Sequence, residues 1–344
     1  MKKRFLALVT LLLAACSKAP DLVVYCSLDQ EFSQPLIEEF EAETGLTVRA
    51  EFDTEANKTV GLSRRLLEEA KNPRCDVYWN NEVAQTVNLA AQGVLQPYAS
   101  PSAADIPAQF KDPENLWTGF AARARVFIVN TTKVADPSQI DSMWDLIAPE
   151  WEGQATIARP LTGTTLTHAA ALYQVLGEEK AREYLQAIAS HQNENPPLVH
   201  VASSNGQTMR KVREGELAFG WTDTDDFAVA LAAGTPVTVV YPDQQPGPNG
   251  EEPLGTLLIP NSVSIPKGAP HLDNAKRFVD WVLSRKMEER LANSKSAQIP
   301  VRADVPRPAS VRSDFKVMAV DYQKLGQELP ARTQELKDMF LNTK

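Results

Sequence analysis

Three aspartates stand close together near residue 225, directly after an apolar stretch at positions 216–222. Asp223, Asp225 and Asp226 fall within four consecutive residues. Carboxylates at this spacing repel one another unless water solvates them, a helix N-terminus accepts them or a cation binds between them. The segment predicts either the solvated start of a helix or part of a cation site, with Asp225 and Asp226 as the candidate ligands.

A second candidate site is the segment PLTGTT at positions 160–165, between a predicted strand and a predicted helix. A glycine at such a turn lets backbone N–H groups approach an anion, and the helix dipole favours negative charge at the same place. Thr162, Gly163, Thr164 and Thr165 are therefore candidate anion-binding residues. The alternative is a helix that a threonine caps without any ligand.

Two further polar segments follow predicted strands in the first hundred residues. Asp29 comes after the strand at 22–26, and Asn81 and Glu82 come directly after the strand at 76–79. Their oxygen atoms suit a hard cation or a polar solute, and the same residue types also cap helix N-termini without a ligand. We take Asp29 and Glu82 as candidate cation ligands and Asn81 as a candidate solute contact.

The elements that would position these segments alternate between strand and helix. Apolar or β-branched runs predict strands, and apolar residues at helical spacing between them predict helices. This alternation indicates an α/β fold built from βαβ units with mainly parallel sheets. The strands are expected at 22–26, 46–52, 76–79, 123–130, 155–158, 216–222 and 256–265. A polar helical stretch is expected from Ser310 to the C-terminus.

The strand at 123–130 is expected to carry the chain from one α/β unit into a second one. Two units joined by strands, rather than by a loose linker, leave a cleft between them. Ligands of such sheets bind outside the carboxyl ends of the strands, close to helix N-termini. This geometry selects the four polar segments described above as the candidate walls of the cleft.

Composition and motifs favour a binding protein over an enzyme. The 344-residue chain has a formal net charge of −9, so it has no basic excess to neutralise the phosphates of a nucleic acid. Its four histidines show no metal-type spacing, and neither a nucleophile elbow nor a phosphate-binding Walker pattern is present. We expect no catalytic residues, no resident cofactor and no nucleic-acid partner.

The N-terminus has the form of an export signal. A basic start at residues 2–4 precedes a short apolar run that ends in LAAC at Cys16. These features describe a secretory signal peptide, expected at residues 1–15. The LAAC ending is similar to a bacterial lipobox, which makes Cys16 the candidate lipidation site and residues 16–21 an anchored linker. The alternative is an ordinary signal with a chance cysteine.

Apart from Cys16, the chain has two cysteines, Cys26 and Cys75. Cys26 ends one predicted strand and Cys75 begins another, so parallel neighbouring strands would hold the two thiols about 13 Å apart, at opposite ends. A disulfide needs Cα atoms within about 7 Å of each other. Two free thiols are expected.

Segments along nearly the whole mature chain resemble bacterial periplasmic solute-binding proteins of the ferric-iron-binding group, which deliver ligands to ABC permeases. The likeness rests on LVVYCSLD with FEAETGLTV, CDVYWNNE, RARVFIVNT, PLTGTT, GELAFGW, and NAKRFVDWVLS with SAQIPVR. The resemblance implies a type II periplasmic-binding-protein fold with two lobes, hinge strands and closure on the ligand. Lobe 1 is expected at 22–120 plus 255–302, and lobe 2 at 121–254 plus 303–344.

The resemblance also implies a ligand pattern, and this chain departs from it. In the family, a histidine, a glutamate and a pair of tyrosines hold iron, and an anion binds at a helix turn of the second lobe. The histidine position falls here on Asp29, and the glutamate position on Asn81 or Glu82. The tyrosine pair falls on Asp225 and Asp226, so only the PLTGTT turn keeps the family's character.

Three functions remain open on these residues. In the first, Asp29, Glu82, Asp225 and Asp226 hold ferric iron or another hard cation as transported cargo, with an anion on the turn at 162–165. In the second, the ligand is an organic zwitterion such as 2-aminoethylphosphonate, whose phosphonate occupies that turn and whose ammonium meets Asp225 or Asp226. The third is a surface scaffold lipoprotein without a solute.

The two receptor hypotheses share one cellular setting. The protein would be a monomer in the periplasm or at the cell surface, tethered to a membrane by its lipid. It would serve an ABC permease in the inner membrane.

Overall fold

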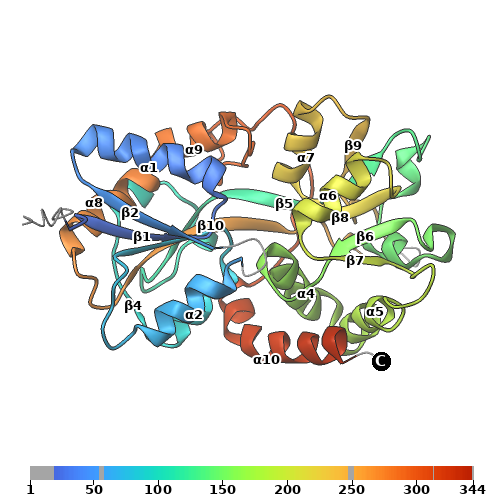
Figure 1. Cartoon of the computed structure of the whole chain (residues 1–344), viewed down its shortest axis with the longest axis horizontal. Coiled ribbons are helices and arrows are strands. Elements are labelled where there is room, and N and C mark those ends of the chain that lie inside the picture. Colours follow the sequence, from blue (N-terminus) through green and yellow to red (C-terminus); the bar gives the residue numbers. More distant parts are fainter. Residues whose placement is uncertain (1–18, 54–57, 247–251, 313, 343–344) are drawn as a thin grey trace, which may run out of the picture.

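A computed structural model of the chain describes residues 19–53, 58–246, 252–312 and 314–342. The predicted signal peptide and the predicted lipid site at Cys16 lie outside these residues. Within the described residues, no helix is both long enough and apolar enough to cross a membrane. Figure 1 shows two lobes, one at each end of the long axis, with strands passing between them.

The strands of both lobes belong to one sheet, in the order β2-β1-β3-β10-β5-β8-β6-β7. In lobe 1, β1 pairs in parallel with β2 and β3, and in lobe 2, β6 pairs in parallel with β7 and β8. The long strands β5 and β10 lie between these two sets and pair antiparallel with each other. The bounds are β1 Leu22–Cys26, β2 Val48–Phe52, β3 Val77–Asn80, β4 Leu95–Gln96, β5 Thr118–Asn130, β6 Ala155–Ala158, β7 His200–Ala202, β8 Phe219–Asp223, β9 Val237–Val240 and β10 Leu258–Pro266.

The α-helices connect the strands and cover both faces of each lobe's sheet (Figure 1). Their bounds are α1 Gln30–Thr44, α2 Val60–Glu68, α3 Ala84–Ala91, α4 Gly163–Leu176, α5 Glu178–Ser190, α6 Asn205–Arg213, α7 Thr224–Ala232, α8 Leu272–Val282, α9 Arg285–Asn293 and α10 Tyr322–Leu341.

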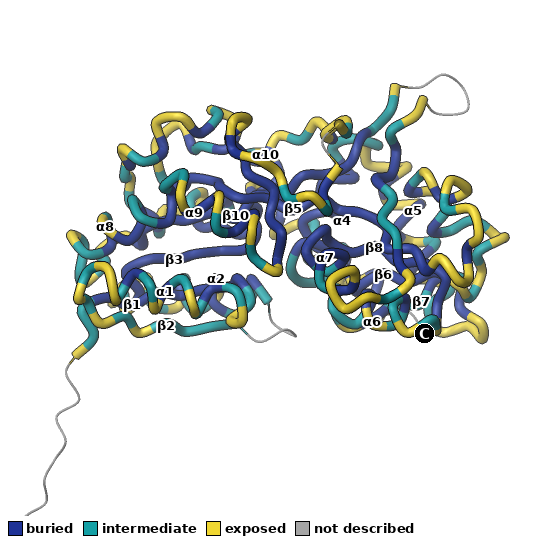
Figure 2. The backbone as a smooth tube through the Cα atoms, turned by 90° about the horizontal axis from the view of Figure 1, so that it is seen from above, coloured by how far each residue is buried: buried dark blue, intermediate teal, exposed yellow. Residues whose placement is uncertain are grey.

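Two-sided burial explains why the strand segments read as nearly continuous apolar runs. Side chains alternate across a strand, and in β1 Val24 packs into one apolar cluster with α1 and α8, whereas Val23 packs into another with α2 and α3. In β5, Phe127 and Ile128 divide in the same way between two clusters of lobe 2. Figure 2 shows the buried strands inside each lobe and the partly exposed helices outside.

This architecture confirms the predicted fold class. Parallel strands flanked by helices form each lobe, and antiparallel crossing strands join the lobes, as in periplasmic binding proteins. The expected residue bounds of the two lobes stay a prediction. One observation bears on them: α10 packs against α3 of lobe 1 as well as against α4 and α5 of lobe 2.

The C-terminal helix begins later than the sequence pattern predicts. The sequence pattern predicts helical structure from Ser310, whereas α10 begins at Tyr322, where the Asp321 side chain accepts a capping hydrogen bond from the backbone N–H of Lys324. Before it, Val317 forms an isolated bridge with Thr256. Pairing with the segment before β10 therefore replaces the first part of the expected helix.

Cys26 and Cys75 are free and buried, as predicted. Cys26 is the register partner of Trp79 in the parallel pair of β1 and β3, so Cys75 lies toward the opposite end of that pair. Burial raises the pKa of the Cys26 thiol to about 12. Both side chains serve as small apolar groups of the core.

Candidate ligand-binding site

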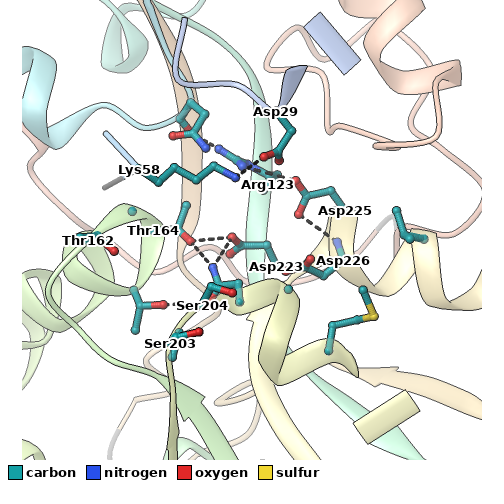
Figure 3. Close-up of a pocket in the computed structure, with 18 of the residues that line it drawn as sticks. Asp29, Lys58, Arg123, Thr162, Thr164, Ser203, Ser204, Asp223, Asp225 and Asp226 are labelled. Carbon is teal, nitrogen blue, oxygen red and sulfur yellow. Dashed lines mark hydrogen bonds and ion pairs between the residues drawn. The ribbon is translucent and has the colours of Figure 1, made fainter. Parts of the chain in front are cut away.

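A cavity of about 340 Å³ lies at the carboxyl ends of β1, β3, β6 and β8, where residues from both lobes meet (Figure 3). Among the described residues, those that line it are Asp29, Glu31, Phe32, Lys58, Asn81, Arg123, Ala158, Arg159, Thr162, Gly163, Thr164, Thr165, Ser203, Ser204, Asn205, Gly206, Met209, Arg210, Asp223, Asp225, Asp226 and Val229. Of the residues predicted to contact the ligand, all except Glu82 line this cavity.

Three helices of lobe 2 begin at this cavity: α4 at Gly163, α6 at Asn205 and α7 at Thr224. The first N–H groups of a helix have no acceptor inside it and carry the positive end of the helix dipole. Converging helix starts of this kind bind anions. We call the starts of α4 and α6, residues 162–165 and 203–206, the cradle.

The start of α4 shows why the sequence places a glycine in the cradle. Gly163 has a φ of +58°, in the left-handed region that residues with a Cβ rarely adopt. The preceding residue, Thr162, accepts no capping hydrogen bond with its side chain. The N–H groups of the first turn of α4 therefore have no side-chain cap at their own N-cap residue and are available to an anion in the cavity.

The hydroxyl groups of the cradle threonines, in contrast, are already hydrogen-bonded within the protein. Thr164 Oγ1 donates to Asp223 Oδ2 at 2.5 Å and accepts from Asn205 Nδ2 at 2.8 Å. Thr165 Oγ1 donates to Asn205 Oδ1 at 2.9 Å and accepts from Arg125 Nη2 at 3.3 Å. The protons that Thr164 and Thr165 could offer a ligand are therefore those of their backbone amides.

The fully buried Arg125 contacts the side chains of the cradle residues Thr164 and Thr165. Arg125 of β5 is the register partner of Asp223 at the end of β8, and its Nη1 lies 2.8 Å from Asp223 Oδ1. Its Nε contacts His168 Nδ1 at 3.5 Å, and burial lowers the pKa of His168 well below its usual value. Burial raises the pKa of Asp223, but the charges of Arg125 and Arg123 outweigh it and lower that pKa overall. Asp223 is therefore an ionised partner of Arg125.

The other two aspartates occupy the start of α7, and each already has a partner. Asp225 Oδ2 lies 3.3 Å from Nη1 of buried Arg123. Burial, opposed by Arg123 and reinforced by Asp223, raises the pKa of Asp225 to about 6. Asp226 accepts a short hydrogen bond from the Thr222 hydroxyl, and burial next to Asp225 raises its pKa well above the usual value.

These three aspartates have the spacing of a cation site but not its electrostatics. One carboxylate oxygen from each of Asp223, Asp225 and Asp226 lies within 4.8 Å of the others. However, Arg125 and Arg123 neutralise two of them, and burial favours the protonated form of the third. A bound metal ion would have to displace two buried ion pairs.

Lobe 1 contributes fewer groups to the cavity. Asp29, at the N-cap of α1, forms an ion pair of 2.6 Å with Lys58. The backbone carbonyl of Asn81 accepts a short hydrogen bond from Arg123, and the buried side-chain oxygen of Asn81 has no partner among the described residues. Figure 3 shows Arg123 and Lys58 close to Asp29 and Asp225.

Glu82, a predicted cation ligand, lies elsewhere. Its side chain is completely buried and caps α3, accepting hydrogen bonds from the N–H groups of Ala84 at 2.5 Å and Gln85 at 2.9 Å. It also accepts from Asn80 Nδ2 at 2.9 Å and from Thr167 Oγ1 at 2.8 Å. Because these four donors occupy its carboxylate, we do not assign it to the ligand.

The basic side chains of the cavity were not predicted from the sequence. Lys58, Arg123, Arg159 and Arg210 line it, and Arg125 stands behind Asp223. Arg159 and Arg210 are exposed beside the cradle and form no ion pair with any described residue. A signal existed for two of the five: arginines two residues apart inside the apolar run RARVFIVN point to one face of a buried strand.

Comparison with known proteins agrees with this geometry. Residues 35–319 match a family model described as bacterial extracellular solute-binding protein. The iron uptake protein A1 of Synechocystis is 26% identical, over 95% of this chain and 92% of its own length. The major ferric iron-binding protein of Neisseria meningitidis is 22% identical, over 91% and 89%.

Solved structures show the same fold. A ferric binding protein from Campylobacter jejuni superimposes with a TM-score of 0.80 at 20% identity, covering 92% of this chain and 99% of that one. A periplasmic binding protein from Actinobacillus pleuropneumoniae, solved with fructose 6-phosphate bound, gives 0.78 at 25% identity, covering 93% and 98%.

The family consists of transport receptors, which confirms the expectation of a binding protein rather than an enzyme. Its members are periplasmic proteins that bind a solute and interact with an ABC permease. By fold, by sequence and by the interlobe cavity, the chain belongs to the bacterial extracellular solute-binding proteins.

Proposed function

We propose that this protein captures a small organic phosphate or phosphonate for an ABC importer. The observation that carries the proposal is the pairing of the cradle with Arg159 and Arg210, two exposed cavity arginines without ion-pair partners among the described residues. Guanidinium groups and helix N-termini are the donors that recognise phosphoryl oxygens. An anionic group of the ligand therefore binds at the start of α4 and α6.

The size of the cavity supports an organic ligand. One water molecule needs about 10–15 Å³ of cavity volume, whereas this cavity has about 340 Å³. A sugar phosphate or an aminoalkylphosphonate fits this volume, and a bare metal ion leaves most of it to water. The similar protein from Actinobacillus pleuropneumoniae was solved with fructose 6-phosphate, a ligand of the same chemical class.

The far end of the ligand meets the aspartates. Asp225 and Asp226 face the cavity from the start of α7, and Asp29 faces it from lobe 1. These carboxyl groups accept hydrogen bonds from an ammonium or from hydroxyl groups. Either a zwitterion such as 2-aminoethylphosphonate or a sugar phosphate satisfies both ends of the cavity.

Ferric iron held with an anion is the second candidate. The spacing of the three aspartates and the names of the iron-uptake relatives favour it. Against it stand the two ion pairs with Arg123 and Arg125, and no tyrosine is among the described residues of the cavity lining. The positive charge of the arginines favours the organic anion.

Calorimetry tests the two candidates directly. We expect 2-aminoethylphosphonate or fructose 6-phosphate to bind at micromolar concentration or below, inorganic phosphate to bind more weakly, and ferric citrate not to bind. Saturable ferric binding by protein stripped with chelator, without binding of either organic ligand, would reverse the assignment. The radius of gyration from small-angle scattering should decrease when the ligand is added, because the cavity residues come from both lobes and ligand binding favours the closed form.

We also propose that the receptor is a monomer held at the membrane by acylation of Cys16. The lipobox-like LAAC segment supports this. A protein that carries at least two acyl chains stays stably attached to a membrane. Mass spectrometry of the mature N-terminal peptide should find an acylated cysteine. Cys16→Ser should release the protein into the soluble fraction, and recovery of unmodified Cys16 from membranes would contradict the proposal.

A further inference from the structure

The Glu82 carboxylate accepts four hydrogen bonds from described residues, and one of them crosses from lobe 1 to lobe 2. Its other side-chain partners, Asn80, Ala84 and Gln85, all lie near the end of β3 and the start of α3 in lobe 1. The fourth donor, Thr167 Oγ1 at 2.8 Å, belongs to α4 of lobe 2. The contact therefore joins the two bodies that move when such a receptor opens and closes.

Thr167 lies on the helix that begins at the cradle. It is one helical turn after Gly163, and the Gly163 carbonyl oxygen is a second, more distant acceptor for the same hydroxyl, at 3.4 Å. The Thr167 side chain is buried, so no water competes for its proton in this conformation. A pull on Thr167 therefore acts on the segment whose N–H groups face the ligand.

Glu82 is also fixed to a crossing strand. The backbone carbonyl of Glu82 accepts a hydrogen bond from Ser262 Oγ of β10 at 2.9 Å, and Ser262 in turn contacts Thr86 Oγ1 of α3 at 2.8 Å. Helix α3, β10 and the Glu82 carboxylate thus form one buried polar unit. This unit makes Glu82 a rigid acceptor, and a hydrogen bond to a charged, preorganised acceptor is stronger than one between neutral groups.

We propose that Glu82 and Thr167 form an interlobe latch that holds the cradle helix against lobe 1 in the closed receptor. Neither residue lines the cavity, so both act as positioning residues through α4. In the open receptor the hydroxyl turns to Gly163 and water reaches the carboxylate. The latch stabilises the closed state with or without a ligand.

Thr167→Val tests the latch, because valine keeps the shape of threonine and removes the hydroxyl. The matched control is Thr208→Val, at a fully buried position of α6 where the threonine hydroxyl has no hydrogen-bond partner among the described residues. Small-angle scattering of the ligand-free proteins reports the balance of open and closed forms and needs no knowledge of the ligand. We expect Thr167→Val alone to shift this balance toward the open form.

Ligand kinetics give the second readout. For 2-aminoethylphosphonate or fructose 6-phosphate, whichever binds, Thr167→Val should speed dissociation about fivefold to tenfold and leave association nearly unchanged. Thr167→Ser, which restores the hydroxyl, should recover the wild-type rate. If Thr167→Val matches wild type and Thr208→Val in both scattering and dissociation, or if Thr167→Ser fails to rescue it, the latch is wrong. Failure of both organic ligands to bind would refute the proposed function and leave the scattering test intact.

Discussion

The two ends of the cavity begin helices in opposite electrostatic settings. At the cradle, α4 and α6 start without a carboxylate of their own, and Arg159 and Arg210 add positive charge. At the other end, α7 starts with Asp225 and Asp226, which Arg123 and Thr222 hold in place. Under the proposed function, the same structural device, a helix start at a strand end, serves an anion at one place and a hydrogen-bond donor or an ammonium group at the other.

This difference teaches that the identity of a site depends on which charges are already paired. The cavity has more carboxylates than basic groups along its lining, and a count of residue types would make it a cation site. Pairing reverses the conclusion, because Arg123 and Arg125 are paired with Asp225 and Asp223, whereas Arg159 and Arg210 beside the cradle have no ion-pair partner among the described residues. The predictions below test that polarity, from the largest effect to the smallest.

We call Arg159 and Arg210, which lie beside the cradle, the cradle arginines. Removing both should have the largest effect on ligand affinity. Each charged hydrogen bond to a phosphoryl group is worth about 1.5–3 kcal/mol, so Arg159→Ala with Arg210→Ala should weaken binding of 2-aminoethylphosphonate or fructose 6-phosphate by at least about 100-fold in calorimetry. Arg213→Ala is the matched control, since Arg213 lies one turn from Arg210 on α6, pairs with Glu214 and does not line the cavity. Equal affinities for the double variant and the control would show that the anion does not bind at the cradle.

Changing the aspartate end should have a smaller effect that depends on the ligand. Asp225→Asn removes the charge that an ammonium would meet and keeps the shape of the side chain. We expect about a tenfold loss for 2-aminoethylphosphonate and less than threefold for fructose 6-phosphate, which offers only hydroxyls at that end. Equal losses for both ligands would show that the aspartate end does not recognise charge.

The pH dependence of the same pair of ligands gives a third test. Because the pKa of Asp225 is raised to about 6, its ionised form is present above that pH and is lost as the pH falls below it. Affinity for the ammonium ligand should therefore decrease from pH 7 to pH 5. The phosphoryl group also titrates near pH 6, so the informative quantity is the part of the decrease that Asp225→Asn abolishes. An unchanged profile in this variant would contradict the role of Asp225.

Lys58→Met should have the smallest effect. The Lys58–Asp29 pair is partly exposed, with 17% and 32% of the two side chains accessible, and exposed ion pairs contribute about 0–1 kcal/mol. We expect less than a fivefold change in the affinity for either organic ligand. A loss as large as that of the cradle arginines would mean that lobe 1 binds the anion.

Several parts of the fold and site follow from sequence alone. The apolar runs at β1, β3, β5 and β6 specify strands buried on both faces, and their alternation with amphipathic helices specifies the α/β class. The glycine of PLTGTT is required by the left-handed turn at the start of α4. These features depend on local backbone geometry and on the spacing of apolar residues along the chain, so short segments determine them.

Only the tertiary structure decides which charged groups meet. Arg125 and Asp223 are 98 residues apart and become partners through the register of β5 with β8. Glu82 and Asn81 are neighbours in the chain, yet one caps α3 and contacts α4 while the other lines the cavity. A charge acts according to its distance from other charges and from water, and strand register and lobe packing set those distances. The sequence therefore indicated a two-lobed solute-binding protein with a polar cleft, and only the folded chain shows the charge pairing on which the proposed anion site rests.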